Sequence, residues 1–520
     1  MIAGASAIAV AVAVAIGVSS DDTVAVIDHD PIDALTVIPI PRSVDTGTGT
    51  GHLHLTDDTR IVVTDESRAE GERLAASLRP ASGLPLTVTD AERRSGDVAL
   101  VITDDTDPAE AYRLRIDDTG ALLTATAPTG LFYGSQTLRQ LLPAEIEGSD
   151  LVDPPDGGWR LPMVIVRDAP RYEWRGAMLD VARHFFDVTT IVAYIDQLVA
   201  YKINRLHLHL TDDQGWRIEL PSWPDLTGIG GQTDIDGGAG GWLSADDYRR
   251  ITDYAARRHL TVVPEVDMPG HVNAALASVG ALNRSGRPST IGGTTTYGQS
   301  SLSAELPATA PFITSVFTEL AAMTPGPYIH LGGDEAFATS PEDYASMVRL
   351  AIAAIREAGK IPVGWEEIVD ADIDGPYTAQ HWLDPLKAVR AARGGAQVIM
   401  SPAGHAYLDQ KYDAQTALGL DWAGHIDVDS AYRWDPLDAG VEPEAIIGVE
   451  APLWSETVTT PDDIEYLAFP RVIGLAEIGW SGTADRALDD YLRRLGAHGP
   501  RLAAQGIDFH RSPLVDWGPT

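Results

Sequence analysis

The sequence predicts an α/β protein in which a (β/α)8 TIM barrel follows a small α+β domain. Three observations support this prediction. From about Tyr172 onwards, eight short apolar segments typical of strands recur, with amphipathic segments typical of helices between several of them. Before Tyr172, a shorter stretch mixes alternating strands with two amphipathic helices. Carboxylate and aromatic side chains follow the predicted barrel strands, at the face where parallel barrels carry their functional sites.

Composition favours a large folded protein and excludes several classes of function. The chain has 520 residues, of which 44% are hydrophobic, so it can bury a large core divided over two or three domains. The 75 acidic residues outnumber the 38 basic ones and give a formal charge of −37, which would repel a nucleic-acid backbone. The absence of cysteine excludes disulfides, thiolate catalysis and cysteine-ligated zinc.

Residues 1–37 are predicted to be an export signal or membrane anchor followed by a linker. The segment Ile2–Val18 is apolar and rich in Ala and Val, and the small residues Ser19 and Ser20 follow it. No Lys or Arg precedes the segment, so the usual basic start of a signal peptide is missing, and an Ala-rich tail is the alternative. The expected location is therefore extracytoplasmic, either secreted or held at the cell surface.

Residues 38–168 are predicted to form the small α+β domain. Alternating apolar residues predict strands at Arg60–Thr64, Leu86–Thr89 and Val98–Thr103, and helical spacing predicts helices at Ala69–Leu78 and Phe132–Leu142. This stretch contains no cluster of convergent polar residues that would indicate a site.

Residues 169–520 are predicted to form the barrel and a C-terminal helical segment. The predicted strands are Gly176–Leu179, Arg205–Leu210, Thr261–Pro264, Tyr328–Leu331, Ile361–Gly364, Tyr377–Ala379, Gln397–Met400 and Ile446–Val449. Helical spacing covers Ile191–Tyr201. Ser244 is a candidate N-cap for a helix that runs to Arg258, and Ser340 with Pro341 predicts another helix start.

The residues that follow these strands are rich in carboxylates and aromatic rings. In strand order they are Asp180, Arg183 and His184; Asp212, Asp213 and Trp216; Glu265, Asp267 and His271; Asp334 and Glu335; Trp365; His381 and Trp382; Tyr407 and Asp409; and Glu450, Trp454 and Glu456. Carboxylates bind hydroxyl groups and can protonate a glycosidic oxygen, while Trp rings stack on the C–H faces of sugars. The pattern therefore indicates a carbohydrate site.

Five segments resemble glycoside hydrolase family 20, the β-N-acetylhexosaminidases, and they occur in the order typical of that family. They are MLDVARHFF at Met178–Phe186, HLHLTDDQGWRIE at His207–Glu219, PEVDMPGH at Pro264–His271, HLGGDE at His330–Glu335 and APLWSE at Ala451–Glu456. The resemblance covers about residues 38–510 and implies a barrel enzyme that releases terminal N-acetylhexosamine from a glycan, by an exo-acting and retaining reaction.

The resemblance also implies a role for each matching residue. Glu335 matches the general acid/base, Asp334 the residue that orients the acetamido group, Tyr407 the donor to its oxygen, and Asp212 with His271 a supporting pair behind the acid. Arg183, Asp409 and Glu456 match residues that bind sugar hydroxyls; Trp365, Trp382 and Trp454 match aromatic walls, and Trp422 matches a platform for the next sugar. The implied chemistry uses no cofactor and no metal.

The adjacency of Asp334 and Glu335 agrees with that mechanism. A retaining glycosidase usually places an acid and a carboxylate nucleophile about 5 Å apart on opposite sides of the anomeric carbon, which suits sequence neighbours poorly. If the acetamido oxygen of the substrate is the nucleophile, one acid and one carboxylate that polarises the amide suffice. Substrate-assisted catalysis of this kind is a property of the family.

Other interpretations of these patterns remain open. The Gly-Gly-Asp-Glu run is also typical of a simple turn. His207 and His209 alternate on one strand and so share a face, which is compatible with a metal site, although core packing is the commoner role. Within the family, a relative that releases a disaccharide such as lacto-N-biose is the alternative enzyme. A non-catalytic glycan-binding protein is the alternative outside enzymes.

Overall fold

Eight parallel strands close into a barrel, as the sequence predicts. The computed structural model describes residues 35–47, 51–291 and 298–518, and the predicted export segment Ile2–Val18 lies outside these ranges. The barrel strands are β10 (Trp174–Asp180), β11 (Arg205–His209), β12 (Thr261–Glu265), β13 (Tyr328–His330), β14 (Ile361–Trp365), β15 (Thr378–His381), β16 (Gln397–Met400) and β17 (Ile446–Leu453). All eight predicted strands are found, and β17 extends beyond the predicted Val449.

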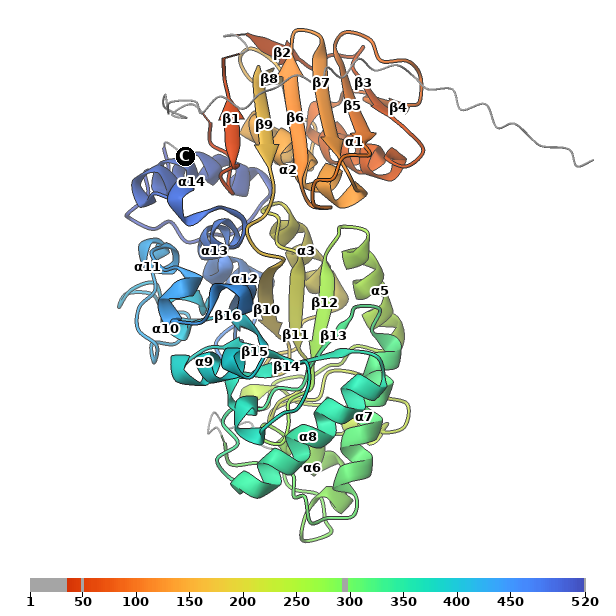
Figure 1. Cartoon of the computed structure of the whole chain (residues 1–520), viewed down its shortest axis with the longest axis vertical. Coiled ribbons are helices and arrows are strands. Elements are labelled where there is room, and N and C mark those ends of the chain that lie inside the picture. The colour runs from red at the N-terminus through yellow and green to blue at the C-terminus, as the bar shows by residue number, and fades with distance from the viewer. Residues whose placement is uncertain (1–34, 48–50, 292–297, 519–520) are drawn as a thin grey trace, which may run out of the picture. The chain divides into compact units, whose positions relative to one another are not determined.

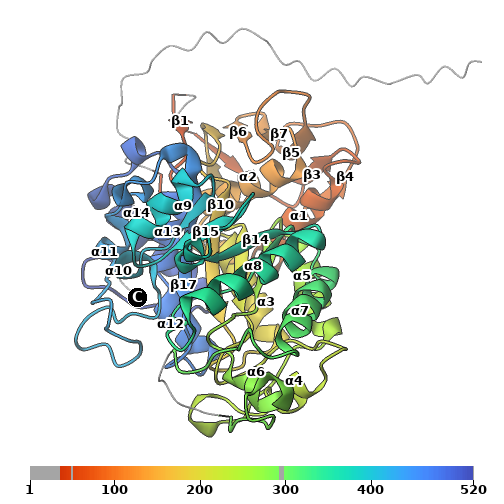
Figure 2. The same cartoon turned by 60° about the horizontal axis from the view of Figure 1, so that its bottom comes forward.

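Helices surround the barrel strands, as Figures 1 and 2 show. The longer ones are α3 (Val188–Val199), α5 (Ala245–Ala256), α7 (Thr309–Met323), α8 (Pro341–Glu357), α9 (Pro385–Arg393), α12 (Pro461–Ala468), α13 (Arg471–Trp480) and α14 (Leu488–Ala504). The predicted caps are present: the Ser244 side chain accepts from Asp247 N in a capping box, and Ser340 accepts from Asp343 N. These caps satisfy backbone groups that helix starts would otherwise leave unpaired.

The barrel strands are buried on both faces, because helices cover the outside and side chains fill the inside. Every residue of β10 and of β17 is buried. Five strands contribute to one buried apolar cluster, formed by Trp174, Val263, Val363, Ile399 and Ile447. Burial on both faces explains why these strands appear in the sequence as nearly continuous apolar runs.

The small domain is a seven-stranded sheet with two helices, which confirms the predicted α+β domain. The strand order is β1-β9-β6-β7-β5-β3-β4. The strands are β1 (Ser43–Asp45), β3 (Arg60–Val63), β4 (Thr87–Thr89), β5 (Asp97–Ile102), β6 (Tyr112–Asp117), β7 (Gly120–Ala125) and β9 (Val164–Asp168). The helices α1 (Arg68–Ser82) and α2 (Pro128–Leu141) contact each other and the sheet, and β2 (His52–His54) pairs with β8 (Arg160–Pro162).

A buried ion pair joins the small domain to the barrel domain. Lys202 follows α3, and its Nζ lies 3.0 Å from Oδ2 of Asp168 at the end of β9; neither side chain is exposed. Nζ of Lys202 also donates to the Tyr112 hydroxyl at 3.0 Å, and Nε1 of Trp480 donates to Oδ1 of Asp168 at 2.9 Å. Each buried charge therefore has a partner, which offsets the cost of removing it from water.

Lys202→Met should destabilise the protein by about 3–5 kcal/mol, because Asp168 would stay buried without its cation. Lys202 lies just before β11 and Asp212 just after it, so the ion pair is at the opposite end of the barrel strands from the predicted site residues, and the rate per folded molecule should stay at the wild-type value. Urea denaturation measures the change, with Arg249→Met as the control, since Arg249 is 63% exposed in its pair with Asp246. A loss below about 1 kcal/mol, the range of exposed pairs, would show that the buried pair does not hold the two domains together.

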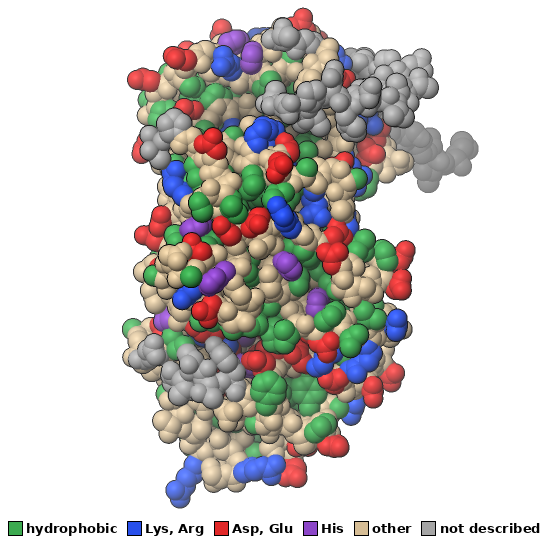
Figure 3. Space-filling model, turned by 90° about the vertical axis from the view of Figure 1, so that its left-hand side faces the viewer, with side chains coloured by type: hydrophobic (Ala, Val, Ile, Leu, Met, Phe, Trp, Pro, Cys, Tyr) green, Lys and Arg blue, Asp and Glu red, His purple; other side chains and the backbone are tan. Residues whose placement is uncertain are grey.

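Acidic side chains are spread over the protein surface. Figure 3 shows Asp and Glu side chains distributed over one face, among fewer Lys and Arg. Among the described residues, no helix has the length and apolar composition needed to cross a membrane.

Candidate active site

The predicted site residues lie in loops that follow the barrel strands. Arg183 follows β10, Asp212 follows β11, His271 follows β12, Asp334 and Glu335 follow β13, Trp365 ends β14, Trp382 follows β15, Tyr407, Asp409 and Trp422 follow β16, and Trp454 and Glu456 follow β17. In a parallel barrel these strand ends share one face. The contacts described below link all of these residues, so the structure brings the whole predicted set together.

The turn that carries Asp334 and Glu335 requires its two glycines. Gly332 and Gly333 have φ angles of 70° and 103°, in the left-handed region that side chains rarely adopt. A Cβ on Gly332 would lie 1.8 Å from Oδ1 of Asp267. Glu335 also has a positive φ, 42°, and such strain in a non-glycine residue is typical of functional sites. The run is therefore a turn, and it is one that presents two carboxylates.

Asp212 and His271 stand behind this turn. Nδ1 of His271 donates to Oδ1 of Asp212 at 3.2 Å, and the Arg183 guanidinium lies 2.9 Å from Oδ2 of Asp212. Nε2 of His271 lies 3.6 Å from Asp334 Oδ2 and 3.7 Å from Glu335 Oε2. Burial lowers the pKa of His271, but Asp212 and Asp334 outweigh burial and raise it well above its usual value. His271 is thus a cation beside both carboxylates.

Asp334 has a protonated neighbour in Asp267. Burial and the charge of Asp334 raise the pKa of Asp267 well above its usual value, so Asp267 keeps its proton beside Asp334. Burial also raises the pKa of Asp334, while His271 lowers it. Oδ1 of Asp334 has no hydrogen-bond partner among the described residues. A buried carboxylate oxygen without a donor is an unsatisfied acceptor. The Glu335 side chain is the more exposed of the two, at 27% against 12%.

Aromatic rings form one continuous cluster beside these carboxylates. Trp365, Tyr407 and Trp454 are buried. The ring centroid of Trp454 lies 5.8 Å from Trp365 and 6.3 Å from Tyr407, and Trp382 stacks parallel to Tyr407 at 6.4 Å. Nε1 of Trp382 donates to the carboxylate of Glu367 at 3.1 Å, which fixes the indole. Such rigid apolar walls suit the faces of a sugar ring and an acetamide methyl group.

Two further contacts connect the aromatic cluster to its surroundings. The Arg183 guanidinium lies over the Trp454 ring at 4.8 Å, which joins the cluster to the carboxylate turn through Asp212. Trp422 is 51% exposed and stands edge-on to Tyr407 at 5.8 Å. An exposed ring next to buried ones is the arrangement expected of a platform for a second sugar.

Asp409 and Glu456 face each other on the loops after β16 and β17. Burial and the charge of Glu456 raise the pKa of Asp409 to about 8. Gln410 donates to Oδ2 of Asp409 at 2.7 Å, and Oδ1 of Asp409 has no partner among the described residues. At neutral pH the pair holds a proton, so it offers both a donor and acceptors to sugar hydroxyls.

Asp409→Asn should stabilise the free protein increasingly as the pH rises from about 4 to about 8. The folded-state pKa of Asp409, about 8, exceeds its ordinary value, so the stability that this group contributes is full below pH 4 and is lost towards pH 8. The loss reaches at most about 1.4 kcal/mol per pH unit, and the amide does not titrate. Thermal unfolding at pH 5 and pH 8 measures the difference, with Asp421→Asn, at an exposed position of the same loop, as the control. A variant no more stable than wild type at pH 8 would contradict the proton-sharing pair.

Sequence reasoning overlooked the residues that hold the site in place. It assigned no role to Asp267, which holds Asp334, or to Asp180, which lies 3.2 Å from Arg183. It missed Glu367, which holds Trp382, although Glu366 and Glu367 directly follow the end of β14 and were visible as adjacent carboxylates. It also grouped Asp180, Glu265, His381 and Glu450 with the residues that follow the strands, whereas all four belong to strands and are buried.

Several carboxylates and histidines lie close enough to hold a metal ion. The groups are His207, Glu265 and His330; Asp212, Asp267 and His271; His271, Asp334 and Glu335; and Glu265, Asp267 and Asp334. Histidines and carboxylates in these groups already form ion pairs with one another, so a metal ion would have to replace these contacts.

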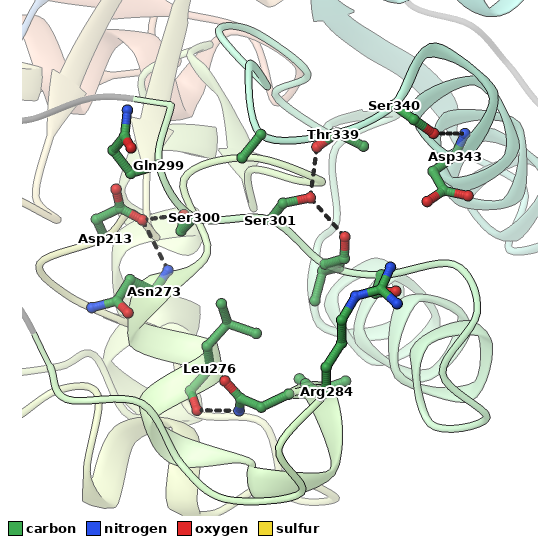
Figure 4. Close-up of a pocket in the computed structure, with 15 residues that line it drawn as sticks. Asp213, Asn273, Leu276, Arg284, Gln299, Ser300, Ser301, Thr339, Ser340 and Asp343 are labelled. Carbon is green, nitrogen blue, oxygen red and sulfur yellow. Dashed lines mark hydrogen bonds between the residues drawn. The ribbon is translucent and has the colours of Figure 1, made fainter.

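A cavity of about 470 Å³ lies beside the acid turn but contains none of the predicted site residues. Figure 4 shows Asp213 accepting from Ser300 and from the backbone of Asn273, and Ser301 bonded to Thr339. Asp213 follows Asp212 directly, so the cavity borders the loops of the site. Its lining is polar and hydrogen-bonded within itself. The candidate chemistry lies with the carboxylate turn and the aromatic cluster, outside this cavity.

A parallel barrel whose strand ends carry an acid, a buried partner carboxylate and aromatic walls defines the class of the protein, a glycoside hydrolase. The family model "Glycosyl hydrolase family 20, catalytic domain" matches residues 172–483, and "Glycosyl hydrolase family 20, domain 2" matches residues 34–169. The chain belongs to glycosyl hydrolase family 20, which confirms the resemblance seen in the sequence.

Relatives match along nearly the whole chain. A β-N-acetylhexosaminidase of Cellulomonas fimi is 43% identical over 495 residues, which are 93% of this chain and 98% of the relative. The solved β-N-acetylhexosaminidase of Streptomyces coelicolor A3(2) has a TM-score of 0.89 at 43% identity and covers 93% of this chain and 99% of its own. A mutant β-hexosaminidase of Streptomyces plicatus in complex with its product GlcNAc has a TM-score of 0.89 at 44% identity, covering 93% and 98%.

Proposed function

We propose that the protein removes terminal, non-reducing β-linked N-acetylglucosamine or N-acetylgalactosamine from glycans with retention of configuration. The observation that carries this proposal is that the Asp334 carboxylate lies near the Tyr407 hydroxyl. Burial raises the pKa of the Tyr407 hydroxyl well above its usual value, and the charges of Asp409 and Asp334 raise it further, so Tyr407 remains a hydrogen-bond donor. A carboxylate acceptor and a hydroxyl donor near each other match the N–H and C=O of an acetamido group.

In the proposed reaction Glu335 protonates the glycosidic oxygen while the acetamido oxygen of the substrate attacks the anomeric carbon. The leaving group departs as an alcohol, and the sugar becomes a cyclic oxazolinium ion with positive charge on nitrogen. Asp334 stabilises that charge, and Tyr407 holds the oxygen in line. Glu335, now ionised, takes a proton from water, which attacks the same carbon and opens the ring. Each attack inverts the configuration of the anomeric carbon, so the product keeps the configuration of the substrate.

Product analysis over a panel of N-acetylated glycosides tests this proposal. The expected products are single N-acetylhexosamine units from the non-reducing end. The Streptomyces plicatus structure holds GlcNAc, which supports a monosaccharide product. Release of a disaccharide would favour a lacto-N-biosidase-like enzyme. No hydrolysis of any panel member, together with measurable glycan binding, would favour a non-catalytic glycan-binding protein, although that class would have no need to keep both Glu335 and Tyr407.

Activity should not depend on a metal or another cofactor, since the proposed steps use only carboxylates, Tyr407 and the substrate amide. Dialysis against a chelator should leave kcat/KM unchanged, and metal analysis of the dialysed protein serves as the control. Loss of activity that a divalent ion restores would contradict the proposed chemistry and point to one of the groups of histidines and carboxylates described above.

We further propose that the protein acts outside the cytoplasm. The apolar segment Ile2–Val18 supports export or anchoring. Fractionation of cells that produce the full chain, beside a version beginning at residue 38, tests this proposal. Recovery of both proteins in the cytoplasmic fraction would contradict it.

A further inference from the structure

The register of the barrel aligns four polar residues at the ends of neighbouring strands. Asp180 pairs with His209 across β10 and β11, His209 with Glu265 across β11 and β12, and Glu265 with His330 across β12 and β13. All four are buried. Side chains at paired positions of a parallel sheet point to the same side, so Glu265 is placed among ionisable neighbours inside the barrel.

Each oxygen of the Glu265 carboxylate accepts a hydrogen bond from a different side chain. Nδ1 of His209 donates to Oε2, and Nε1 of Trp365 donates to Oε1 at 2.9 Å. The imidazoles of His207 and His330 lie 3.0 Å and 3.1 Å from the carboxylate. Burial raises the pKa of Glu265, but His209, His330 and His207 outweigh burial and hold it well below its usual value. Glu265 is therefore a buried carboxylate ion.

One arm of these contacts leads to the general acid. Nε2 of His209 donates to Oδ2 of Asp212 at 2.9 Å, and Oδ1 of Asp212 accepts from His271, whose other nitrogen faces Glu335. Acid and base alternate along Glu265, His209, Asp212, His271 and Glu335. The first three contacts are hydrogen bonds, and the last is a charge contact of 3.7 Å between His271 and Glu335. An error in the position of Glu265 would pass along these contacts to the acid.

The other arm leads to the wall expected beside the acetamido group. Trp365 is 1% exposed, and its indole packs in the cluster that contains Tyr407 and Trp454. The bond from its Nε1 to Glu265 is the contact that sets the rotation of the indole within that cluster. A Trp that had no such acceptor would leave a buried N–H group unsatisfied.

We infer that Glu265 is a positioning residue that aligns both halves of the reaction, the acid through His209 and Asp212, and the acetamido pocket through Trp365. This inference rests on the proposed function. One side chain thus fixes the distance between the proton donor and the nucleophile of the substrate, although Glu265 touches neither. Only a carboxylate can accept both hydrogen bonds and balance the charge of His209.

Glu265→Gln tests the inference, because the amide keeps the size of the side chain and loses the charge and one acceptor. The value of kcat/KM for N-acetylchitobiose should fall on the order of 10²-fold, the scale of a misplacement distant from the reacting atoms. The inhibition constant of a thiazoline mimic of the intermediate should rise at least about tenfold, because the Trp365 wall is displaced.

The pH profile should also move. The groups that face His209 are Glu265 on β12, Asp212 on its own loop, Asp180 on β10, and the Trp454 ring at 4.9 Å. Burial lowers the pKa of His209, but Glu265 and Asp212 outweigh burial and raise it well above its usual value. Loss of the Glu265 charge lowers that pKa, so the alkaline limb of kcat/KM should move to lower pH.

His209→Asn separates the two arms, since it breaks the chain to Asp212 and leaves the bond between Trp365 and Glu265. This variant should lose activity on N-acetylchitobiose, retain most activity on an aryl glycoside with a good leaving group, and bind the thiazoline like wild type. If Glu265→Gln does not fold, this pattern in His209→Asn still tests the acid arm.

Glu477→Gln is the matched control. Glu477 on α13 is equally buried and accepts from Arg494 and from the Tyr432 hydroxyl, neither of which is a predicted site residue. It should lower thermal stability while leaving the pH profile and the inhibition constant unchanged. The inference is overturned if Glu265→Gln behaves like Glu477→Gln, or if His209→Asn weakens the thiazoline as much as Glu265→Gln does. Failure of the wild-type protein to cleave any N-acetylhexosaminide would instead refute the proposed function.

Discussion

Glu335→Gln should reduce hydrolysis of N-acetylchitobiose by roughly 10²–10⁴-fold, the usual contribution of a general acid. The amide has the shape of the acid but cannot protonate the departing oxygen. The turn around Gly332 and Gly333 should keep its form, because the substitution changes neither glycine nor the size of the side chain. Thermal unfolding and GlcNAc binding should therefore remain close to the wild-type values.

The size of this loss should depend on the leaving group. An aryl glycoside whose phenolate leaves without protonation should lose far less activity than N-acetylchitobiose, because the missing step is proton donation. Comparison of kcat/KM for phenols of increasing acidity measures this dependence. A matched control is Glu342→Gln on the exposed first turn of α8, which should leave every rate unchanged. An equal loss on all substrates would show that Glu335 has another role.

Asp334→Asn should reduce the rate by roughly 10²–10³-fold, as does the loss of a preorganised electrostatic partner in other enzymes. Asn cannot balance positive charge on the nitrogen of the oxazolinium ion. It would also change the contact with Asp267, whose pKa the charge of Asp334 helps to raise. Replacing the acetamido group of the substrate by hydroxyl should be at least as damaging, because the nucleophile itself is then absent.

Combining Asp334→Asn with the substrate that lacks the acetamido group shows whether Asp334 acts through that group. On a β-glucoside, wild type and Asp334→Asn should be equally poor, since Asp334 has no amide to polarise. On the N-acetylglucosaminide, the rates of wild type and Asp334→Asn should differ by the whole expected factor of roughly 10²–10³. Efficient turnover of the glucoside by wild type would contradict attack by the acetamido oxygen, and a large effect of Asp334→Asn on the glucoside would assign Asp334 a different role.

The fold could be predicted because its signals are local. Each barrel strand is a short apolar run with polar residues at its end, and helix starts such as Ser244 and Ser340 carry recognisable caps. To assign a site residue to the end of a given strand, only the order of strands and polar residues along the chain is needed. Since the strand ends of a parallel barrel meet on one face, residues as far apart in the chain as Arg183 and Glu456 could be assigned to one site from that order alone.

The partners of those residues could not be predicted, because pairing depends on register and on burial. Trp365, which donates to Glu265, lies 100 positions further along the chain. Asp267, on the loop after β12, lies beside Asp334 on the loop after β13. A shift of one residue along a strand would turn Glu265 from the inside of the barrel to the outside, and sequence patterns locate strand ends less accurately than that. Protonation states, such as those of Asp267 and Asp409, depend on the same contacts.

The central proposal is that the substrate supplies the nucleophile, and its most direct test varies the nucleophile alone. A series of aryl N-acetylglucosaminides with zero to three fluorines on the acetyl methyl group lowers the electron density of the amide oxygen step by step. Inhibition constants of the matching thioglycosides correct for changes in binding. Substrate-assisted catalysis predicts that kcat/KM falls steeply with each fluorine, by orders of magnitude over the series. A rate that is independent of fluorination after this correction would contradict it and assign the nucleophile to a carboxylate of the protein.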